Sequence, residues 1–178
     1  MKQNCLMLGA GHAEPKRRLA SPDSASEEDT RWTTLDNNKE CKPNKLFDLE
    51  LLETGEQLPF PMCTFDEVHA YEILEHLGRQ GNAKGLFSTF RALWIVLKPQ
   101  GLLMATCPSM TSQWLWAEPG HTRVITHGTL AFLTKNHYDQ LGKTSCSDYR
   151  SMVHPCWWEI ADAKEEGETF AFALRKVA

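Results

Sequence analysis

The segment at residues 65–106 constrains the fold more than any other part of this sequence. Residues 65–70 are typical of a buried strand, and from Asn82 onward the apolar side chains recur at helical spacing along one face. The string Lys-Pro-Gln-Gly at residues 98–101 must end that helix, because proline disfavours the helical conformation in the residue before it and glycine permits a reversal. The apolar run at residues 102–106 predicts a further strand, which completes a β–α–β crossover and indicates an α/β protein with a mainly parallel sheet.

Further strands are predicted on both sides of this crossover. Residues 4–8 and 31–35 each end in turn residues, and residues 45–48 form a weaker third strand. Near the end of the sequence, residues 157–161 and 169–174 predict a β-hairpin with one well-packed face. We therefore expect a mainly parallel sheet that closes with an antiparallel hairpin.

Size and charge exclude several classes of protein. A chain of 178 residues is expected to form one domain, spanning residues 1–178. The net charge of −4 gives no field that would hold a nucleic-acid backbone nonspecifically, and the one basic cluster, Lys16-Arg17-Arg18, is expected to be a solvated turn or a helix start. The six cysteines show no C-x-x-C pair and are expected to be free thiols. Because the sequence lacks a long apolar span and a secretory signal, the default location is cytoplasmic.

Glycines and carboxylates follow the first three predicted strands. Gly9-Ala10-Gly11 can bring bare backbone close to a ligand, because no Cβ intervenes at the glycines. Asp36, at the end of the second strand, could accept hydrogen bonds from both hydroxyls of a ribose, although an Asx turn would also explain it. Asp48, after the third strand, could accept a hydrogen bond from an adenine amino group or cap a helix.

The order of these positions resembles that of a known family. The glycine loop and Asp36 are followed by Asp48-Leu49 and then by three strings: F-D-x-V at residues 65–68, L-E-H-L at 74–77 and L-K-P-x-G at 97–101. Over about residues 4–108 the sequence is similar to the class I S-adenosylmethionine-dependent methyltransferases. The resemblance implies a Rossmann-like α/β fold with a seven-stranded, mainly parallel sheet and a C-terminal antiparallel hairpin. It also implies S-adenosyl-L-methionine as the cofactor.

The resemblance implies a set of site residues as well. In this family the glycine loop receives the methionine part of the cofactor, the acidic residues after strands two and three receive the ribose and the adenine, and the segment after strand four borders the methyl-transfer site. The cofactor contacts expected on this basis are Gly9, Ala10, Gly11, His12, Asp36, Asn37, Asp48, Leu49, Tyr71 and Glu72. If the acceptor must lose a proton, Glu72 and His121 are the candidate general bases, although His121 could equally be a surface-loop histidine.

The sequence departs from the family pattern after the first strand. The glycine loop lacks a third glycine. Residues 21–30 carry no large apolar side chain, so the helix that usually follows the loop is expected to be shortened to residues 14–20 or missing. A module that keeps the fold for binding or assembly without turnover is therefore the alternative function. A nicotinamide oxidoreductase is a third hypothesis, weakened because a dinucleotide fold needs the third glycine.

The remaining histidines and tryptophans are assigned structural roles. His76 is expected to cap or pack its helical turn, and no metal is predicted, because the histidines show no metal-ligand spacing. Core or lid packing is favoured over an acceptor pocket for Trp114, Trp116, Trp157 and Trp158. No N-P-P-Y string follows the fourth strand, so a DNA base is not the first choice of substrate. The methyl acceptor, a small molecule or a protein or nucleic-acid group, is left open, and the chain is expected to act as a monomer or homodimer away from membranes.

Overall fold

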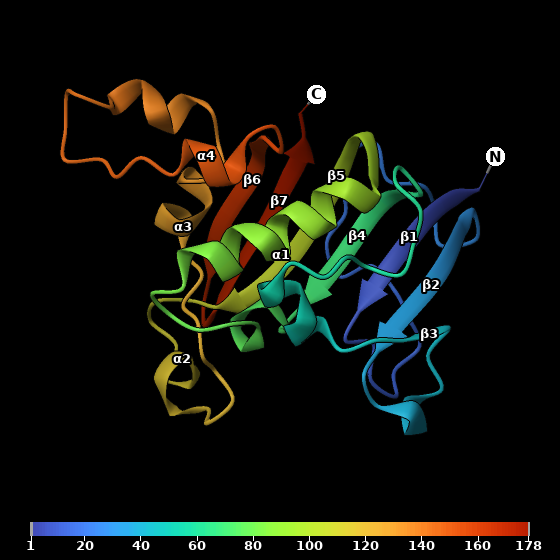
Figure 1. The fold of residues 1–178 in the computed structure, drawn as a ribbon. Coiled ribbons are helices and arrows are strands. Elements are labelled where there is room, and N and C mark those ends of the chain that lie inside the picture. Colours follow the sequence, from blue (N-terminus) through green and yellow to red (C-terminus); the bar gives the residue numbers. More distant parts are fainter. Residues whose placement is uncertain (1, 178) are drawn as a thin grey trace.

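Seven strands form one mixed sheet in the computed structural model, which describes residues 2–177 (Figure 1). The strands are β1 (Gln3–Leu8), β2 (Thr30–Asp36), β3 (Lys45–Leu46), β4 (Phe65–Tyr71), β5 (Leu97–Pro108), β6 (Trp158–Glu166) and β7 (Thr169–Lys176). Their order across the sheet is β3-β2-β1-β4-β5-β7-β6. β1 to β5 pair in parallel, whereas β7 pairs antiparallel with both β5 and β6. The predicted fold class is confirmed.

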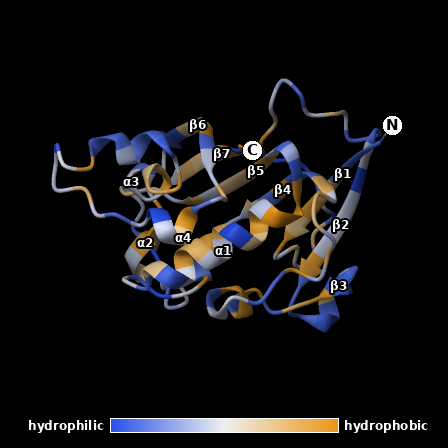
Figure 2. Cartoon of the chain, turned by 45° about the horizontal axis from the view of Figure 1, so that its top comes forward, coloured by the Kyte–Doolittle hydropathy of each residue, from blue (hydrophilic) through white to orange (hydrophobic). Residues whose placement is uncertain are grey.

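Helix α1 (Ala83–Val96) covers the centre of one face of the sheet (Figure 1). Its N-cap is Asn82, as predicted, and the Asn82 side chain accepts a hydrogen bond from the backbone N–H of Gly85. The apolar face of α1 buries Phe90 and Leu93 in a continuous hydrophobic core with the inward side chains of β1, β4, β5 and β7. Figure 2 shows hydrophobic residues concentrated in these strands and on α1.

Shorter helical segments complete the structure. They are η1 (Lys39–Cys41), η2 (Leu49–Thr54), η3 (Leu74–His76), α2 (Trp114–Ala117), α3 (His127–Ala131), η4 (Asn136–Gln140) and α4 (Arg150–Val153). Both η2 and α4 contact α1, so they extend the same helical layer. Among residues 2–177 no helix combines the length and the apolar character needed to cross a membrane. All six cysteines are free thiols, as expected.

The boundaries of two predicted strands differ in the structure. β5 begins at Leu97, directly after α1, rather than at residue 102, because Leu97 already pairs with β4. Residues 98–101 then form a bulge before the pairing resumes at Leu102, with Gln100 in the left-handed region at a φ of 66°. β6 continues to Glu166 rather than ending at residue 161, so the charged residues 164–166 belong to the strand and the hairpin turn follows them. Charged side chains fit there because this part of β6 is mostly exposed.

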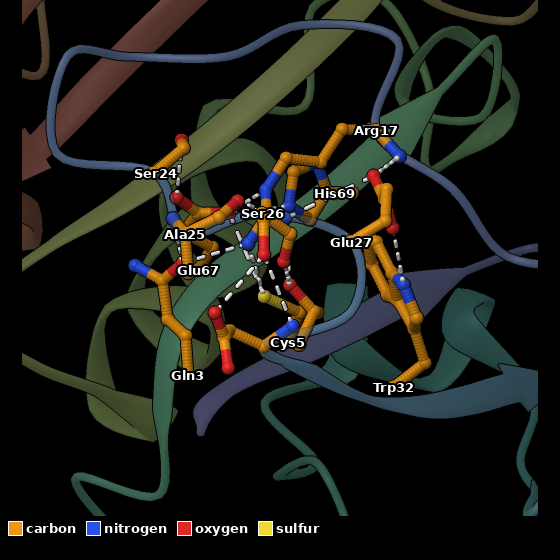
Figure 3. Close-up of polar contacts among 12 residues, drawn as sticks. Gln3, Cys5, Arg17, Ser24, Ala25, Ser26, Glu27, Trp32, Glu67 and His69 are labelled. Atoms are coloured by element: carbon orange, nitrogen blue, oxygen red, sulfur yellow. Dashed lines mark hydrogen bonds and ion pairs between the residues drawn. The ribbon is translucent and has the colours of Figure 1, made fainter. Parts of the chain in front are cut away.

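A coil, rather than a helix, covers part of the opposite face of the sheet. Residues 9–29 contain neither helix nor strand, which agrees with the expectation of a shortened or missing helix. The expectation for the basic cluster was wrong for Arg17, whose side chain is buried and forms an ion pair with the Glu67 carboxylate, with 2.7 Å between Arg17 Nε and Glu67 Oε2 (Figure 3). All five N–H donors of the Arg17 guanidinium are used, with acceptors on Glu67, Ala25, Thr30, Gln3 and Cys5.

Hydrogen bonds take the place of apolar packing beneath this coil. The Tyr71 hydroxyl accepts from the backbone N–H groups of Arg18 and Leu19, so it donates its own proton to Nδ1 of His69, 2.6 Å away. His69 therefore carries its proton on Nε2 and donates it to Glu67, at 3.0 Å. This polar network explains how a segment without large apolar residues can be held on a sheet face.

Burial by itself would raise the pKa of the Glu67 carboxyl. Hydrogen bonds from the His69 ring, the Ser24 hydroxyl and the Arg17 guanidinium outweigh burial and lower this pKa to about 2. Glu67 is therefore an ionised carboxylate inside the protein, and its charge is balanced by Arg17.

Candidate active site

The glycine loop begins where β1 ends. Gly9 and Gly11 both lie in the left-handed region, with φ values of 57° and 59°. The Gly9 N–H donates to the carbonyl oxygen of Leu35 at 2.9 Å, and a Cβ placed on Gly9 would lie only 2.9 Å from Cδ1 of Ile73. A Cβ placed on Gly11 would meet no atom within 4 Å, so the backbone at Gly11 borders open space.

Asp36 ties the end of β2 to this loop. Its side chain is 9% exposed, and its two oxygens accept backbone hydrogen bonds from Gly11 and Asn38, each at 2.8 Å. The Asx turn that was considered as an alternative is therefore present at Asn38. Each carboxylate oxygen has a further lone pair, so Asp36 can still accept hydrogen bonds from a ligand.

Asp36 lies at a pocket of about 220 Å³, which we name the Asp36 pocket. The carboxyl ends of parallel strands meet at one edge of a sheet, and the pocket lies where β1, β2, β3 and β4 end. Its walls are partly apolar and its polar groups are mainly carboxylates and an amide. The lining residues are Gly9, Asp36, Asn37, Phe47, Asp48, Leu49, Glu50, Ile73, His76 and Leu77. Five of the predicted cofactor contacts, Gly9, Asp36, Asn37, Asp48 and Leu49, are thus brought together.

Asp48 also caps a helical turn. Its Oδ1 accepts a hydrogen bond from the backbone N–H of Glu50 at 3.0 Å, which makes Asp48 the N-cap of η2. The cap and the pocket use the same residue, so the two hypotheses considered for Asp48 do not exclude each other.

A second pocket, of about 380 Å³, adjoins the first and is named here the Glu72 pocket. His76 lines both pockets, and the candidate bases Glu72 and His121 both line the second. Glu72 follows β4 directly and has a φ of 53°, which is unusual for a residue that is not glycine. The remaining lining residues are Pro108, Ser112, Trp114, Glu118, Glu168 and Thr169. The Glu72 pocket is acidic, because three glutamates line it and no lysine or arginine does among the described residues.

Other predicted contacts lie elsewhere. His12 is exposed on the turn after the glycine loop. Ala10 and Tyr71 line a cavity of about 50 Å³ that also touches Gly9, and the Tyr71 hydroxyl is engaged by the coil at residues 18 and 19. The structure therefore does not bring His12, Ala10 or Tyr71 into the Asp36 pocket. Gly11 is also absent from its lining, although the Gly11 N–H donates to Asp36.

Two tryptophans lie exposed on the short helix α2. Trp114 lines the Glu72 pocket with 53% of its surface exposed, and Trp116 on the same short helix is 71% exposed. Neither packs in the core, so for both residues only the lid part of the expectation stays a prediction, whereas core packing is confirmed for Trp158, which is buried. α2 is a single helical turn at the surface, and of its side chains only Leu115 is buried.

Sequence reasoning missed Glu75 and gave His76 only a packing role. Glu75 is 0% exposed, and His76 stands between the two pockets. Burial, together with the neighbouring Glu72 carboxylate, raises the pKa of the Glu75 carboxyl to about 7. The spacing of Glu72, Glu75 and His76 places all three in one short turn after β4, which was a local signal. Their proximity to His121 depends on tertiary structure.

Comparison with known proteins identifies the fold. No protein-family model and no curated protein matches this sequence. Solved structures do match. A SAM-dependent methyltransferase from Archaeoglobus fulgidus is 13% identical with a TM-score of 0.55, and the match covers 98% of this chain and 86% of that one. The N-methyltransferase NodS from Bradyrhizobium japonicum WM9 is 11% identical with a TM-score of 0.57, and the match covers 99% of this chain and 86% of that one. The [4+2]-cyclase SpnF is also similar, with 14% identity and a TM-score of 0.56, and the match covers 99% of this chain and 76% of that one. This protein therefore has the class I methyltransferase fold, a fold that is also found in a cyclase.

Proposed function

We propose that this protein binds S-adenosyl-L-methionine in the Asp36 pocket and transfers its methyl group to an acceptor in the adjoining Glu72 pocket. The observation that carries the proposal is the meeting of the glycine turn, Asp36 and Asp48 at one pocket. Three turns with purely structural roles would not be expected to line the same pocket. The shared wall residue His76 makes the second pocket the natural place for an acceptor.

The residues of the Asp36 pocket suit the cofactor. Asp36 keeps lone pairs that can accept from ribose hydroxyls, and Phe47 and Leu49 offer apolar surface for an adenine ring. Gly11 does not line the pocket, but its backbone N–H donates to Asp36, and it borders open space because it has no side chain. Pockets for whole ligands of this kind measure about 300–1,000 Å³, so the Asp36 pocket suits the adenosyl part and the rest would extend toward the Glu72 pocket.

The chemistry asks mainly for positioning. When bound, the cofactor supplies an electrophilic methyl group on its sulfonium. The two pockets share His76, so a donor in one and an acceptor in the other would lie side by side. Holding reactants in line accounts for much of the rate in such transfers. Where the acceptor must lose a proton, the carboxylate of Glu72 or the imidazole of His121 can receive it, since both line the Glu72 pocket.

The acidic lining also narrows the acceptor class. Glu72, Glu118 and Glu168 would repel a phosphate, so the group that enters the Glu72 pocket is expected to be neutral or cationic. The exposed face of Trp114 at the same pocket offers a surface for a planar or apolar part of that molecule.

Titration calorimetry with S-adenosylmethionine and S-adenosylhomocysteine tests the proposal. We expect binding of one molecule per chain with a dissociation constant in the micromolar range. The same titration with NAD is expected to show no binding. A chain with no micromolar affinity for either sulfur compound would contradict the proposal.

One observation favours a second candidate, a binding or assembly module without turnover. The helix that usually follows the glycine loop is replaced by coil, and the Asp36 pocket is small. Tight binding of the cofactor without methyl transfer to any acceptor offered, or failure to bind the cofactor, would support this alternative.

A further inference from the structure

The Glu75 carboxylate is buried without a hydrogen-bond partner among the described residues. Glu75 is fully buried, and neither of its carboxylate oxygens makes a hydrogen bond of ordinary geometry. The Cys107 thiol and the Glu72 carboxylate lie close to it, but neither supplies a positive charge. Placing a carboxylate in a protein interior without compensation is costly, and native structures rarely leave such groups unpaired. Glu67, which is equally buried, shows the usual solution, because it binds Arg17, Ser24 and His69.

Two histidines approach the unpartnered carboxylate. Nε2 of His121 lies 3.9 Å from Oε1 of Glu75, which is too long for a hydrogen bond, and Nδ1 of His121 is buried and also lacks a partner. The rings of His76 and His121 meet edge to face with their centroids 4.7 Å apart. Glu75, His76 and His121 thus bring oxygen and nitrogen atoms that can ligate a metal close together, and these atoms form no hydrogen bonds with one another.

The orientation of His76 suits a metal ligand. Its Nδ1 lies 3.0 Å from the carbonyl oxygen of Gly120, which can only accept, so Nδ1 carries the proton and Nε2 keeps a free lone pair. A histidine whose second nitrogen donates to a backbone carbonyl is the usual arrangement for metal-binding imidazoles. The hydrogen bond fixes both the tautomer and the direction of the ring.

We propose that Glu75, His76 and His121 form a binding site for one divalent transition-metal cation at the base of the Glu72 pocket. One donor atom from each residue lies within 4.8 Å of the other two. Donors bound to a single ion at about 2.1 Å are at most about 4.2 Å apart, so the cation would draw the three groups slightly inward. This set replaces the expectation from sequence spacing that no metal binds.

Backbone hydrogen bonds hold the two halves of the site together. The N–H groups of Thr122 and Arg123 both donate to the carbonyl oxygen of Glu75, at 3.0 Å each. The Arg123 guanidinium donates to the Leu77 carbonyl at 3.1 Å. The loop that carries His121 is therefore fixed to η3, and the site is formed before any ion binds.

The surroundings and the donors define the class of cation. The carboxylates of Glu72, Glu118 and Glu168 line the adjoining pocket and favour positive charge. Two imidazoles and one carboxylate suit Zn²⁺, Mn²⁺, Fe²⁺ or Co²⁺, whereas Mg²⁺ and Ca²⁺ prefer sites made of oxygen alone. Because His76 and His121 line the Glu72 pocket, a bound ion would face the proposed acceptor site, and this last step rests on the proposed function.

A second cluster with metal-type residues differs in a decisive way. Cys5, Glu67 and His69 also lie within 4.8 Å of one another, on the coil-covered face. There the Arg17 guanidinium already supplies the positive charge and donates to both Cys5 and Glu67 (Figure 3). Among the described residues no such cation pairs with Glu75, so we propose a metal at the Glu75 site alone.

Cobalt titration tests the site directly. Protein stripped with a chelator is titrated with Co²⁺ and followed by visible absorption, with Zn²⁺ as competitor and Mg²⁺ as a comparison. We expect one Co²⁺ per chain, displaced by Zn²⁺ and not by Mg²⁺. Both Glu75→Gln and His121→Ala should weaken binding at least about tenfold. Glu75→Gln keeps the side-chain volume, and His121→Ala removes a loop side chain, so at least one variant should fold.

The control is His127→Ala, which removes an exposed histidine outside the cluster and should leave affinity unchanged. The proposal is overturned if the wild-type chain binds no stoichiometric Co²⁺, if both site variants bind as tightly as wild type, or if His127→Ala weakens binding as much as they do. No cofactor is present in this experiment, so its failure leaves the proposed methyl transfer standing. Conversely, a chain that binds Co²⁺ but not S-adenosylmethionine would refute the proposed function alone.

Discussion

At the scale of single residues, three buried carboxylates are held in three different ways. Asp36, Glu67 and Glu75 are 9%, 1% and 0% exposed, so burial does not distinguish them. Asp36 accepts from two backbone N–H groups, Glu67 is paired with an arginine, and Glu75 has no hydrogen-bond partner. We assign a role in ligand binding to Asp36, in structure to Glu67 and in metal binding to Glu75.

Removal of the Asp36 carboxylate should weaken cofactor binding. Asp36→Ala takes away hydrogen bonds to the ribose, and we expect a loss of about 1–3 kcal/mol of binding free energy, measured by calorimetry with S-adenosylhomocysteine. Asp139→Ala, at an exposed aspartate on η4, is the matched control. A thermal melt of both variants is needed, because Asp36 also holds Gly11 and Asn38. Unchanged affinity in a folded Asp36→Ala protein would remove Asp36 from the site.

Loss of Arg17 should destabilise the protein strongly. Arg17→Ala leaves the buried Glu67 charge uncompensated, and breaking such a pair typically costs about 3–5 kcal/mol. Urea unfolding of wild type and variant measures the difference. Arg150→Ala breaks an ion pair with Asp148 that is largely exposed, and it should leave stability unchanged. An equally small effect of Arg17→Ala would mean that the coil is not held by this pair.

At the scale of elements, the coil at residues 9–29 and strand β4 act as one unit through their polar network. Arg17 and Ser24 from the coil bind Glu67 of β4, and the coil backbone binds Tyr71 of the same strand. A helix would cover the sheet with apolar side chains, whereas this coil depends on charge and hydrogen bonds. Its attachment should therefore depend on pH.

Acid should weaken the folded state through Glu67. The folded-state pKa of Glu67 is about 2, below the ordinary value of 4.5, so the unfolded chain binds the extra proton and stability falls as pH drops from 4.5 toward 2. The contribution is on the order of 3 kcal/mol above this window. Urea unfolding at a series of pH values should show the loss, and Glu67→Gln should show a smaller one. Identical pH profiles for the two proteins would contradict this assignment.

At the scale of the whole molecule, the sheet topology brings the two pockets to one edge. The arrowheads of β1, β2 and β4 point to the same side in Figure 1, where the glycine turn, Asp36 and η3 follow. β5 runs parallel to β4 and ends at the same edge, where the loop that follows it contributes Trp114 and His121. Solved structures with this fold include methyltransferases and a cyclase, so the reaction is decided by pocket side chains rather than by the fold.

Local patterns in the sequence predicted most of the fold. The helical spacing after Asn82, the proline-glycine stop at residues 98–101 and the alternation in residues 169–174 are short-range signals, and each matches an element of the structure. The order of glycine and acidic residues after successive strands predicted Gly9, Asp36 and Asp48 at one pocket, because parallel strands place their carboxyl ends together.

What the sequence by itself determined was therefore the alternation of strands and helices and the residues that follow the first four strands. Only the tertiary structure decided that Arg17 is buried beside Glu67, 50 residues away along the chain, and that His121 lies beside Glu75 and His76. The physical reason is that periodicity and turn chemistry act over a few neighbouring residues. Whether a charged side chain is buried, and which partner it finds or lacks, depends on contacts between segments that are distant in the chain.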